Sequence, residues 1–284
     1  MIILPTAMKT EASQKVDFKR ELDEAYDLPP AAIKSYREKG YVKLKNVFSS
    51  ELLEYYSEVI TEWVFKLNKL TKPMEERTTY EKAFLQVMNL WRENETIKDF
   101  VFSKKLARIA AQLMQVDGVR LYHDQALYKE PSGGITPWHA DQFYWPLSNS
   151  NTVTVWVPLQ ATPMEMGPLA FAEASQNVEI GRDKEISDES EAMLADALKK
   201  FPVHETPFDL GEVSYHSGWT YHRAGTNSSK KARRVMTVIY MDKDIRVIEP
   251  TNDYRIADWQ TWLDSKPVGS VADGTLNPIL YAKN

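Results

Sequence analysis

The sequence contains no cysteine, and this absence excludes several classes of protein at once. Without thiols the chain can form no disulfide framework, iron–sulfur cluster, thiolate metal site or cysteine nucleophile. Any metal ion must therefore be bound by nitrogen and oxygen ligands. An excess of basic residues is also missing, because the formal net charge is −5 and the pI is about 5.7. This balance, with no basic stripe along the chain, indicates a small-molecule partner and no nucleic acid.

Long apolar runs are missing as well. The apolar start, Met1 to Leu4, gives way to charged sequence by Lys9 and is too short for a signal-peptide core or a membrane span. We therefore expect a cytoplasmic protein with no membrane partner. Hydrophobic residues make up 43% of the chain and charged residues 26%, which is ordinary for a globular protein. The sequence does not indicate an oligomeric state.

The first half of the chain is predicted to be helical and the second half mainly strand, which favours a helix-buttressed β architecture over alternating βαβ units. Helical spacing of apolar residues, with capping signals, predicts helices over 31–39, 49–67, 80–91 and 103–115. Short β-rich runs predict strands at 118–129, 138–145, 152–159, 169–172, 212–216, 221–224 and 233–241. Short strands separated by turns fit a sandwich or jelly roll better than an open parallel sheet.

We expect one domain over residues 1–284, since barrels of this length commonly fold around a single core. Helical support would cover about 1–117, the jelly-roll core about 118–245 and a C-terminal tail 246–284. A charged insertion, about 177–209, includes an expected helix at 187–200. It could form a lid over one end of the barrel.

The possible metal ligands are few, because the chain has only five histidines. His139 and Asp141 are two residues apart, and on a strand this spacing directs both side chains to the same face. Two imidazoles and one carboxylate form the facial triad of non-haem iron(II) oxygenases, which leaves three coordination positions open. The third ligand could be His216 or His222.

The turn-like stretch 225–231 favours His222. A hairpin centred between Asn227 and Ser228 would place His222 directly opposite Arg233, so that both side chains face one cavity. An arginine in that cavity could bind the distal carboxylate of a dicarboxylate co-substrate in a bidentate manner. A bulge in the hairpin would instead direct Arg234 inward.

Six segments spread over nearly the whole chain carry a resemblance to a known family. They are GYVKLKNVFS, FLQVMNLW, LYHDQALYKEP, WHADQFYWPL, TVWVPLQATPMEMGPLAF and YHSGWTYHRAGTNSSKKARR. Together they resemble the phytanoyl-CoA dioxygenase family of iron(II)- and 2-oxoglutarate-dependent oxygenases. The resemblance implies a double-stranded β-helix, or jelly roll, wrapped by N-terminal helices.

The resemblance also implies a set of site residues. Iron would be bound by His139, Asp141 and His222, and the co-substrate 2-oxoglutarate by Arg233 with Gln125 and Trp156 nearby. Further candidates for the substrate pocket are Gln86, Asn89, His123, Phe143 and His216. His123 and His216 could equally be ordinary hydrogen-bonded histidines. The catalysis would be centred on iron and O2, with no separate acid or base.

Three positions matter for how far the resemblance extends. Many members have serine two residues after the distal histidine, whereas this chain has Ala224, so a second donor to the co-substrate must come from elsewhere. The usual PGSH after the GPLAF strand is here Glu173-Ala174-Ser175-Gln176. Halogenating relatives have a small residue at the position of Asp141, so the carboxylate indicates oxidation without halogen transfer.

The implied reaction consumes 2-oxoglutarate and O2, releases succinate and CO2, and hydroxylates a substrate C–H bond. Desaturation, cyclisation and epimerisation are alternatives with the same cofactors. Two other classes remain open, a zinc hydrolase with the same three ligands and an inactive binding module on the same fold. No basic patch suits the phosphates of CoA, which favours a secondary or small polar metabolite as the substrate.

Overall fold

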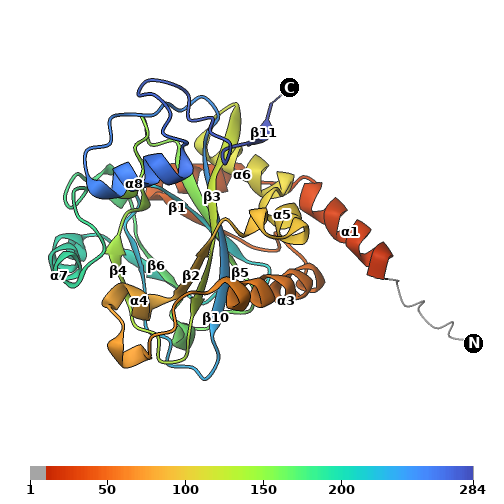
Figure 1. Ribbon diagram of the computed structural model, residues 1–284, viewed down its shortest axis with the longest axis horizontal. Helices are drawn as coiled ribbons and strands as arrows, with labels where there is room; N and C mark the ends of the chain where they lie inside the picture. The colour runs from red at the N-terminus through yellow and green to blue at the C-terminus, as the bar shows by residue number, and fades with distance from the viewer. Residues whose placement is uncertain (1–10, 284) are drawn as a thin grey trace, which may run out of the picture.

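The computed structural model describes residues 11–283, and its centre is a pair of antiparallel β-sheets (Figure 1). Residues 1–10, with the short apolar start, and residue 284 lie outside the described part. The larger sheet has the order β1 (Tyr41–Leu44), β8 (Val213–Ser217), β5 (Thr152–Pro158), β10 (Arg233–Asp242), β3 (Gly118–Lys129) and β11 (Ile279–Ala282), and β2 (Leu85–Met88) also pairs with β3. The smaller sheet has the order β4 (Thr136–His139), β9 (His222–Ala224), β6 (Leu169–Ala172) and β7 (Val203–Glu205). The predicted jelly roll is thus confirmed.

The long strand β10 shows how the sequence separates the two faces of the larger sheet. Arg233 and Thr237 line an internal cavity, whereas Met236, Val238 and Tyr240 belong to the apolar cluster under the helices. This alternation follows from the two-residue period of a strand. The inner face can therefore carry polar groups while the outer face forms the main core.

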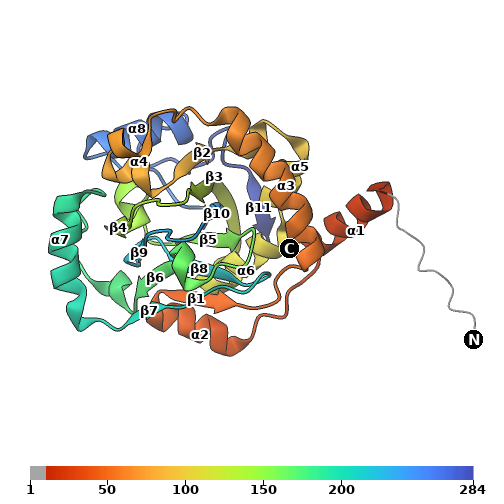
Figure 2. The same ribbon diagram turned by 90° about the horizontal axis from the view of Figure 1, so that it is seen from below.

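Helices cover the outer face of the larger sheet (Figures 1 and 2). They are α2 (Pro30–Lys39), α3 (Ser50–Leu67), α5 (Glu95–Val101) and α6 (Lys104–Met114), while α1 (Glu11–Asp23) packs against α5 and α6 and projects away from the sheets. The side chain of Ser49 accepts a hydrogen bond from Leu52 N at 3.3 Å and caps α3. Gly40, with φ of 82°, ends α2 in the left-handed conformation that favours glycine. The helices predicted at 31–39, 49–67 and 103–115 are confirmed.

The helix predicted over 80–91 is wrong. This stretch forms α4 (Thr79–Ala83), then β2, then a 3₁₀ turn η2 (Leu90–Arg92). In β2, buried Leu85 and Val87 alternate with half-buried Gln86 and Met88, which is the period of a strand. Pairing with β3 overrides the weak helical spacing, and Asn89 breaks the strand at φ of 52°.

The strand predicted over 138–145 is also wrong beyond its second residue. Strand β4 ends at His139, and the chain turns into η3 (Asp141–Tyr144). His139 and Asp141 therefore do not share a strand face as expected. The other strands predicted from the sequence are present, with ends that agree to within one residue.

The insertion contains α7 (Asp188–Ala197) and η6 (Leu198–Lys200), so the helix predicted at 187–200 is confirmed. Helix α7 packs outside β4, where Glu191 accepts a hydrogen bond from Trp138 N at 2.6 Å. Residues 246–284, expected only as a tail, add α8 (Asp253–Trp262) and β11 to the fold. Three short 3₁₀ turns complete the elements, η1 (Met74–Glu76), η4 (Met164–Met166) and η5 (Ser175–Asn177).

Within residues 11–283, no helix has both the length and the apolar character that crossing a bilayer requires.

Candidate metal centre

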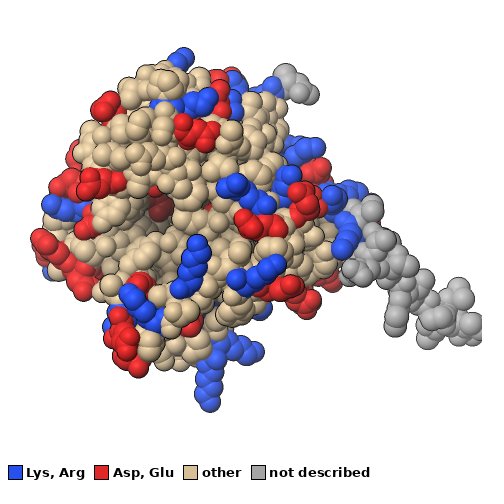
Figure 3. All heavy atoms as spheres, viewed as in Figure 1, with Lys and Arg blue, Asp and Glu red and all other residues tan. Residues whose placement is uncertain are grey.

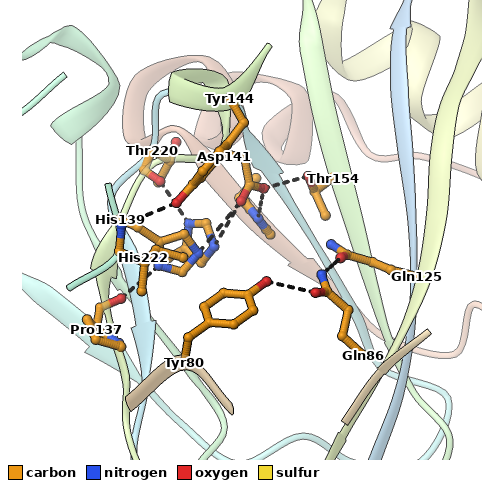
Figure 4. Close-up of polar contacts among 12 residues, drawn as sticks. Tyr80, Gln86, Gln125, Pro137, His139, Asp141, Tyr144, Thr154, Thr220 and His222 are labelled. Atoms are coloured by element: carbon orange, nitrogen blue, oxygen red, sulfur yellow. Dashed lines mark hydrogen bonds and ion pairs between the residues drawn. The ribbon is translucent and has the colours of Figure 1, made fainter. Parts of the chain in front are cut away.

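Two histidines lie opposite each other on neighbouring strands of the smaller sheet. His139 of β4 pairs directly with His222 of β9, and their ring centroids are 4.1 Å apart. The turn η3 begins two residues after His139 and brings Asp141 beside both rings (Figure 4). One ligand atom from each of the three residues lies within 4.8 Å of the others, close enough to share one metal ion.

The two carboxylate oxygens of Asp141 have different surroundings. Oδ1 lies 3.7 Å from Nε2 of His139 and 3.7 Å from Nε2 of His222. Oδ2 accepts a hydrogen bond from Thr154 Oγ1 at 2.8 Å and lies 3.3 Å from Nε2 of His216. Thr154 and His216 therefore hold one oxygen and leave the other for a metal, the usual role of groups behind a ligand.

Backbone carbonyl groups set the orientation of both imidazoles. Nδ1 of His139 lies 2.7 Å from the carbonyl oxygen of Pro137, and Nδ1 of His222 lies 3.0 Å from that of Thr220. A carbonyl can only accept, so in each ring Nδ1 carries the proton. The bare Nε2 atoms then face Asp141 Oδ1, which is the tautomer that metal binding requires.

The ionisation states at this site also suit a metal. Burial lowers the pKa of His139 to about 4 and that of His222 to about 4, so both rings are neutral near pH 7. Burial alone would raise the pKa of Asp141, but the charges and hydrogen bonds of His222, His216 and His139 lower it well below the usual range. Neutral imidazoles and an ionised carboxylate are the protonation states of metal ligands.

The three donors also fit the geometry of a non-haem iron site. Two imidazole nitrogens and one carboxylate oxygen on one side of an ion form a facial triad, which suits iron(II) and leaves positions open for other ligands. All three residues line one internal cavity of about 580 Å³. The open positions would therefore face a space large enough for a co-substrate and a small molecule.

The cavity receives most of the other residues singled out from the sequence. Its lining includes Gln86, His123, Gln125, Trp156, His216 and Arg233. As the alternation of β3 predicts, His123, Gln125 and Leu127 all face it. Gln86 Nε2 donates to Gln125 Oε1 at 2.5 Å, and Tyr80 Oη donates to Gln86 Oε1 at 2.8 Å (Figure 4).

Two of the sequence candidates do not belong to the cavity lining. Asn89 is buried beneath it, and its Oδ1 lies 3.4 Å from the backbone N of Asp124. Phe143 is buried against the rings of Tyr144 and Tyr254, which are the residues that reach the cavity. The positive φ of Asn89 and the 3₁₀ turn at Phe143 account for these orientations.

One end of the cavity has a buried guanidinium, that of Arg233, without an ion-pair partner in the described part of the chain. Arg233 is 1% exposed and lies opposite Lys129 in the β10–β3 pair, and neither forms an ion pair with any residue among 11–283. An Arg233 amino group donates to Gly167 O, but its Nε has no partner, and Trp156 Nε1 has none either. Burial lowers the pKa of Arg233 to about 9. A ligand anion at this end could accept hydrogen bonds from these donors and balance the charge of Arg233.

The hairpin expected to join His222 and Arg233 does not form. Strand β9 pairs with β4 and β6 in the smaller sheet, whereas β10 pairs with β3 and β5 in the larger one. The chain between them crosses from one sheet to the other. Both side chains still line the same cavity, because the two sheets enclose it.

Sequence reasoning missed several residues at the site. Thr154 lies two residues before Trp156 on β5, so the alternation that selected Trp156 could have found it. Thr136 lines the cavity directly opposite Ala224 in the β4–β9 pair, a register that no sequence pattern indicates. The contribution of α8 was missed because this helix has no fully buried residue and a weak apolar pattern.

Comparisons with known proteins agree with this geometry. The model of the family described as Phytanoyl-CoA dioxygenase (PhyH) matches residues 36–235. A probable alpha-ketoglutarate-dependent hypophosphite dioxygenase of Stutzerimonas stutzeri is 25% identical over 227 residues, which cover 74% of this chain and 78% of the relative. Alpha-ketoglutarate is another name for 2-oxoglutarate.

Three solved structures share the fold. The non-haem alpha-ketoglutarate-dependent carbocyclase SnoK from nogalamycin biosynthesis is 24% identical with a TM-score of 0.75, over 89% of this chain and 96% of that one. The epimerase SnoN, in complex with Fe3+, alpha-ketoglutarate and nogalamycin RO, is 23% identical with a TM-score of 0.71, over 89% of this chain and 100% of that one. EctD from S. alaskensis is 15% identical with a TM-score of 0.63, over 80% of this chain and 82% of that one.

The family match spans more than half of the chain and includes His139, Asp141, His222 and Arg233. The chain therefore belongs to the phytanoyl-CoA dioxygenase family and is a non-haem iron oxygenase that uses 2-oxoglutarate.

Proposed function

We propose that this enzyme hydroxylates an unactivated C–H bond of a small molecule, a secondary or small polar metabolite. The reaction consumes 2-oxoglutarate and O2 and yields the alcohol, succinate and CO2. The observation that carries the proposal is the pairing, in one cavity, of a His139–Asp141–His222 cluster with the unpaired cation of Arg233. Asp141 supports hydroxylation over halogenation, because a carboxylate there takes the position that a halide would need.

His139, Asp141 and His222 would hold the iron through Nε2, Oδ1 and Nε2. Bound iron(II) supplies the oxidising chemistry, which the side chains alone cannot provide. Thr154 and His216 keep Asp141 Oδ1 aimed at the metal by binding Oδ2. The carbonyl groups behind both imidazoles fix the rings, so little reorganisation is needed when the metal binds.

Arg233 would bind the distal carboxylate of 2-oxoglutarate, because its planar fork matches a carboxylate and it has no other anion to pair with. Thr136 supports the same role. It faces the cavity opposite Ala224, and its hydroxyl lies 3.4 Å from Lys129 Nζ. Thr136 would thus replace the serine that many family members have at the position of Ala224.

The lining of the cavity also supports the substrate class. Arg233 is the only lysine or arginine among the lining residues that the structure describes. A CoA thioester would bring several phosphate charges that have no basic partner there. A compact substrate without phosphate groups fits better.

The test uses the full chain loaded with iron(II) and 2-oxoglutarate without oxygen, which should give a weak visible charge-transfer band. In air, candidate compounds should stimulate succinate formation, and 18O2 should label the product alcohol. Desaturation, ring closure or epimerisation would leave the product unlabelled and would refute hydroxylation alone. The absence of both band and succinate would refute the proposal entirely.

A pair of neighbouring arginines provides a matched control. Arg233→Ala should raise the 2-oxoglutarate concentration required for succinate formation. Arg234→Ala should not, because Arg234 Nε donates to Gln160 at 2.6 Å and the side chain does not line the cavity. Equal effects of the two substitutions would point to a different anchor for the co-substrate.

A further inference from the structure

Helix α8 directs a stripe of three side chains into the cavity. Tyr254, Asp258 and Trp262 are spaced by four residues, so they lie one above another on the same face of the helix, and all three line the cavity. Figure 1 shows α8 and α4 on opposite sides of the open end of the barrel. The stripe therefore presents a carboxyl group between two aromatic rings on one wall of the cavity.

The carboxyl group of Asp258 is oriented but has no cation to balance it. Tyr122 Oη donates to its Oδ2 at 2.8 Å, and the side chain of Trp262 donates a second hydrogen bond. No lysine or arginine in residues 11–283 forms an ion pair with it. Arg255, the only basic residue of α8, donates instead to the carbonyl oxygen of Phe143 and does not line the cavity.

The pKa of Asp258 is consistent with a carboxylate whose charge no neighbouring cation of the described chain balances. Loss of hydration raises its pKa to about 7, and the hydrogen bonds from Tyr122 and Trp262 offset only part of this rise. A neutral hydroxyl group could accept or donate a hydrogen bond here, but it would leave the negative charge unbalanced. A cationic ligand would balance the charge directly.

Aromatic rings surround the same position. The ring of Tyr254 lies 5.5 Å from that of Tyr144, and the ring of Trp262 lies 5.5 Å from that of His123. Tyr80 of α4 lines the cavity as well. The faces of tyrosine and tryptophan rings attract organic cations, most strongly where water is excluded.

The charges in the cavity are separated by sign. Arg233, the only lysine or arginine among the described lining residues, lies at the end proposed for 2-oxoglutarate, whereas Asp258 and Glu185 belong to the side of α8 and the insertion. Figure 3 shows the hollow on this face of the molecule, with acidic atoms visible inside it. This separation would repel a second 2-oxoglutarate from the substrate position and favour a positively charged substrate.

Tyr80 connects this wall to the metal centre. Loss of hydration raises its pKa to about 12, the hydrogen bond with Gln86 lowers it, and the charges of Asp141 and Asp258 raise it further. The hydroxyl of Tyr80 is thus within electrostatic range of both carboxyl groups. A molecule held at Asp258 would lie in the same cavity that the metal ligands face.

We infer that the substrate of this enzyme carries a protonated amine, which Asp258 binds on the α8 wall of the cavity between the rings of Tyr254 and Trp262. This inference rests on the proposed function and names the substrate class for that same site. It assigns no step of the oxidation to Asp258. The residue acts in binding and positions the remainder of the substrate toward the metal.

Three probes of similar shape and different charge test the inference on the iron-free full chain at pH 8, through quenching of tryptophan fluorescence. They are 2-phenylethylamine, neutral 2-phenylethanol and anionic phenylacetate. The amine should bind at least about tenfold more tightly than the alcohol, and the acid should bind most weakly. Asp258→Asn should abolish this preference, and Asp258→Glu should restore part of it.

Asp253→Asn is the matched control, because Asp253 lies exposed on the same helix and outside the cavity lining. It should keep the amine preference of the unsubstituted protein. Equal binding of amine and alcohol by the unsubstituted protein, or a preference that persists in Asp258→Asn, would overturn the inference. The charge-transfer band with iron(II) and 2-oxoglutarate, recorded for every variant, reports separately on the proposed function and on correct folding.

Discussion

His222 and Arg233 line one cavity from strands of two different sheets, β9 of the smaller sheet and β10 of the larger. The proposed metal ligands His139 and His222 thus come from the smaller sheet, while the proposed anchor of the co-substrate comes from the larger one. The packing of the two sheets fixes the distance between them. Loss of the metal and loss of the co-substrate should therefore be separable by substitution.

His222→Ala should abolish iron binding and succinate formation, because it removes one of the three ligand atoms. The affinity for 2-oxoglutarate should fall by less than the affinity for iron, because the contact with Arg233 remains. Metal analysis after anaerobic gel filtration and calorimetry with 2-oxoglutarate would measure the two effects. His204→Ala is the control, since His204 packs beside Tyr41, with ring centroids 5.5 Å apart, outside the cavity lining. Full iron content in His222→Ala would contradict the assignment.

Thr154→Val should weaken iron binding by about 10- to 100-fold, the usual effect of removing a group that orients a ligand. The substitution preserves shape but removes the hydroxyl that holds Asp141 Oδ2 at 2.8 Å. An iron(II) titration monitored by the charge-transfer band would measure the change. Thr162→Val, at a buried threonine whose hydroxyl bonds to Gln160 O, should leave iron affinity as it is. Unchanged affinity in Thr154→Val would show that His216 alone orients Asp141.

Thr136→Val should raise the KM for 2-oxoglutarate by about tenfold or more, the cost of one hydrogen bond to a charged group. Thr136 and Ala224 are paired directly across β4 and β9. Adding Ala224→Ser to this variant should therefore place a hydroxyl near the lost one and recover much of the affinity. Steady-state kinetics of the single and double variants would test both steps. A normal KM in Thr136→Val would assign the second donor to another residue.

The elements that the sequence predicted correctly are those whose signals are local. The cap at Ser49, the glycine that ends α2 and the two-residue alternation of β3 all depend on neighbouring residues. The ligand set His139, Asp141 and His222 was reached partly through a hairpin that does not exist. Side chains alternate between the two faces of β10, and Arg233 is on the same face as Thr237, which lines the cavity. Its neighbour Arg234 therefore points outward.

What the sequence did not reveal depends on contacts between distant segments. The pairing of β2 with β3 decides that residues 85–88 form a strand, and the register of β4 with β9 sets Thr136 against Ala224. Helix α8 could not be predicted from apolar periodicity, because the face that it turns to the cavity carries tyrosine, aspartate and tryptophan in place of an apolar stripe. A helix that lines a site lacks the pattern of a helix that lines a core.

Asp258→Asn should stabilise the iron-free protein, and more at pH 8 than at pH 5. Burial raises the pKa of Asp258 from its ordinary value of 3.8 to about 7. The folded chain then binds this proton more tightly than the unfolded chain does, so the stability present below pH 3.8 is lost as the pH rises through 7. Asparagine can still accept from Tyr122 but has no charge to desolvate.

Thermal melts of both proteins at the two pH values would measure this effect. The variant should melt a few degrees above the unsubstituted protein at pH 8, and the gain should be smaller but still present at pH 5, because the loss of stability begins at pH 3.8. The other groups near Asp258 are present in both proteins: Tyr122 and His123 on β3, Tyr80 on α4, Glu185 in the insertion and Arg255 on α8. Burial and, to a smaller extent, the charge of Asp258 raise the pKa of Tyr122 and Tyr80, but both hydroxyl groups stay protonated at pH 5 and pH 8 with or without that charge. A gain of equal size at both pH values, or a loss at pH 8, would mean that a cation already balances Asp258. In that case the amine site would lose its physical basis.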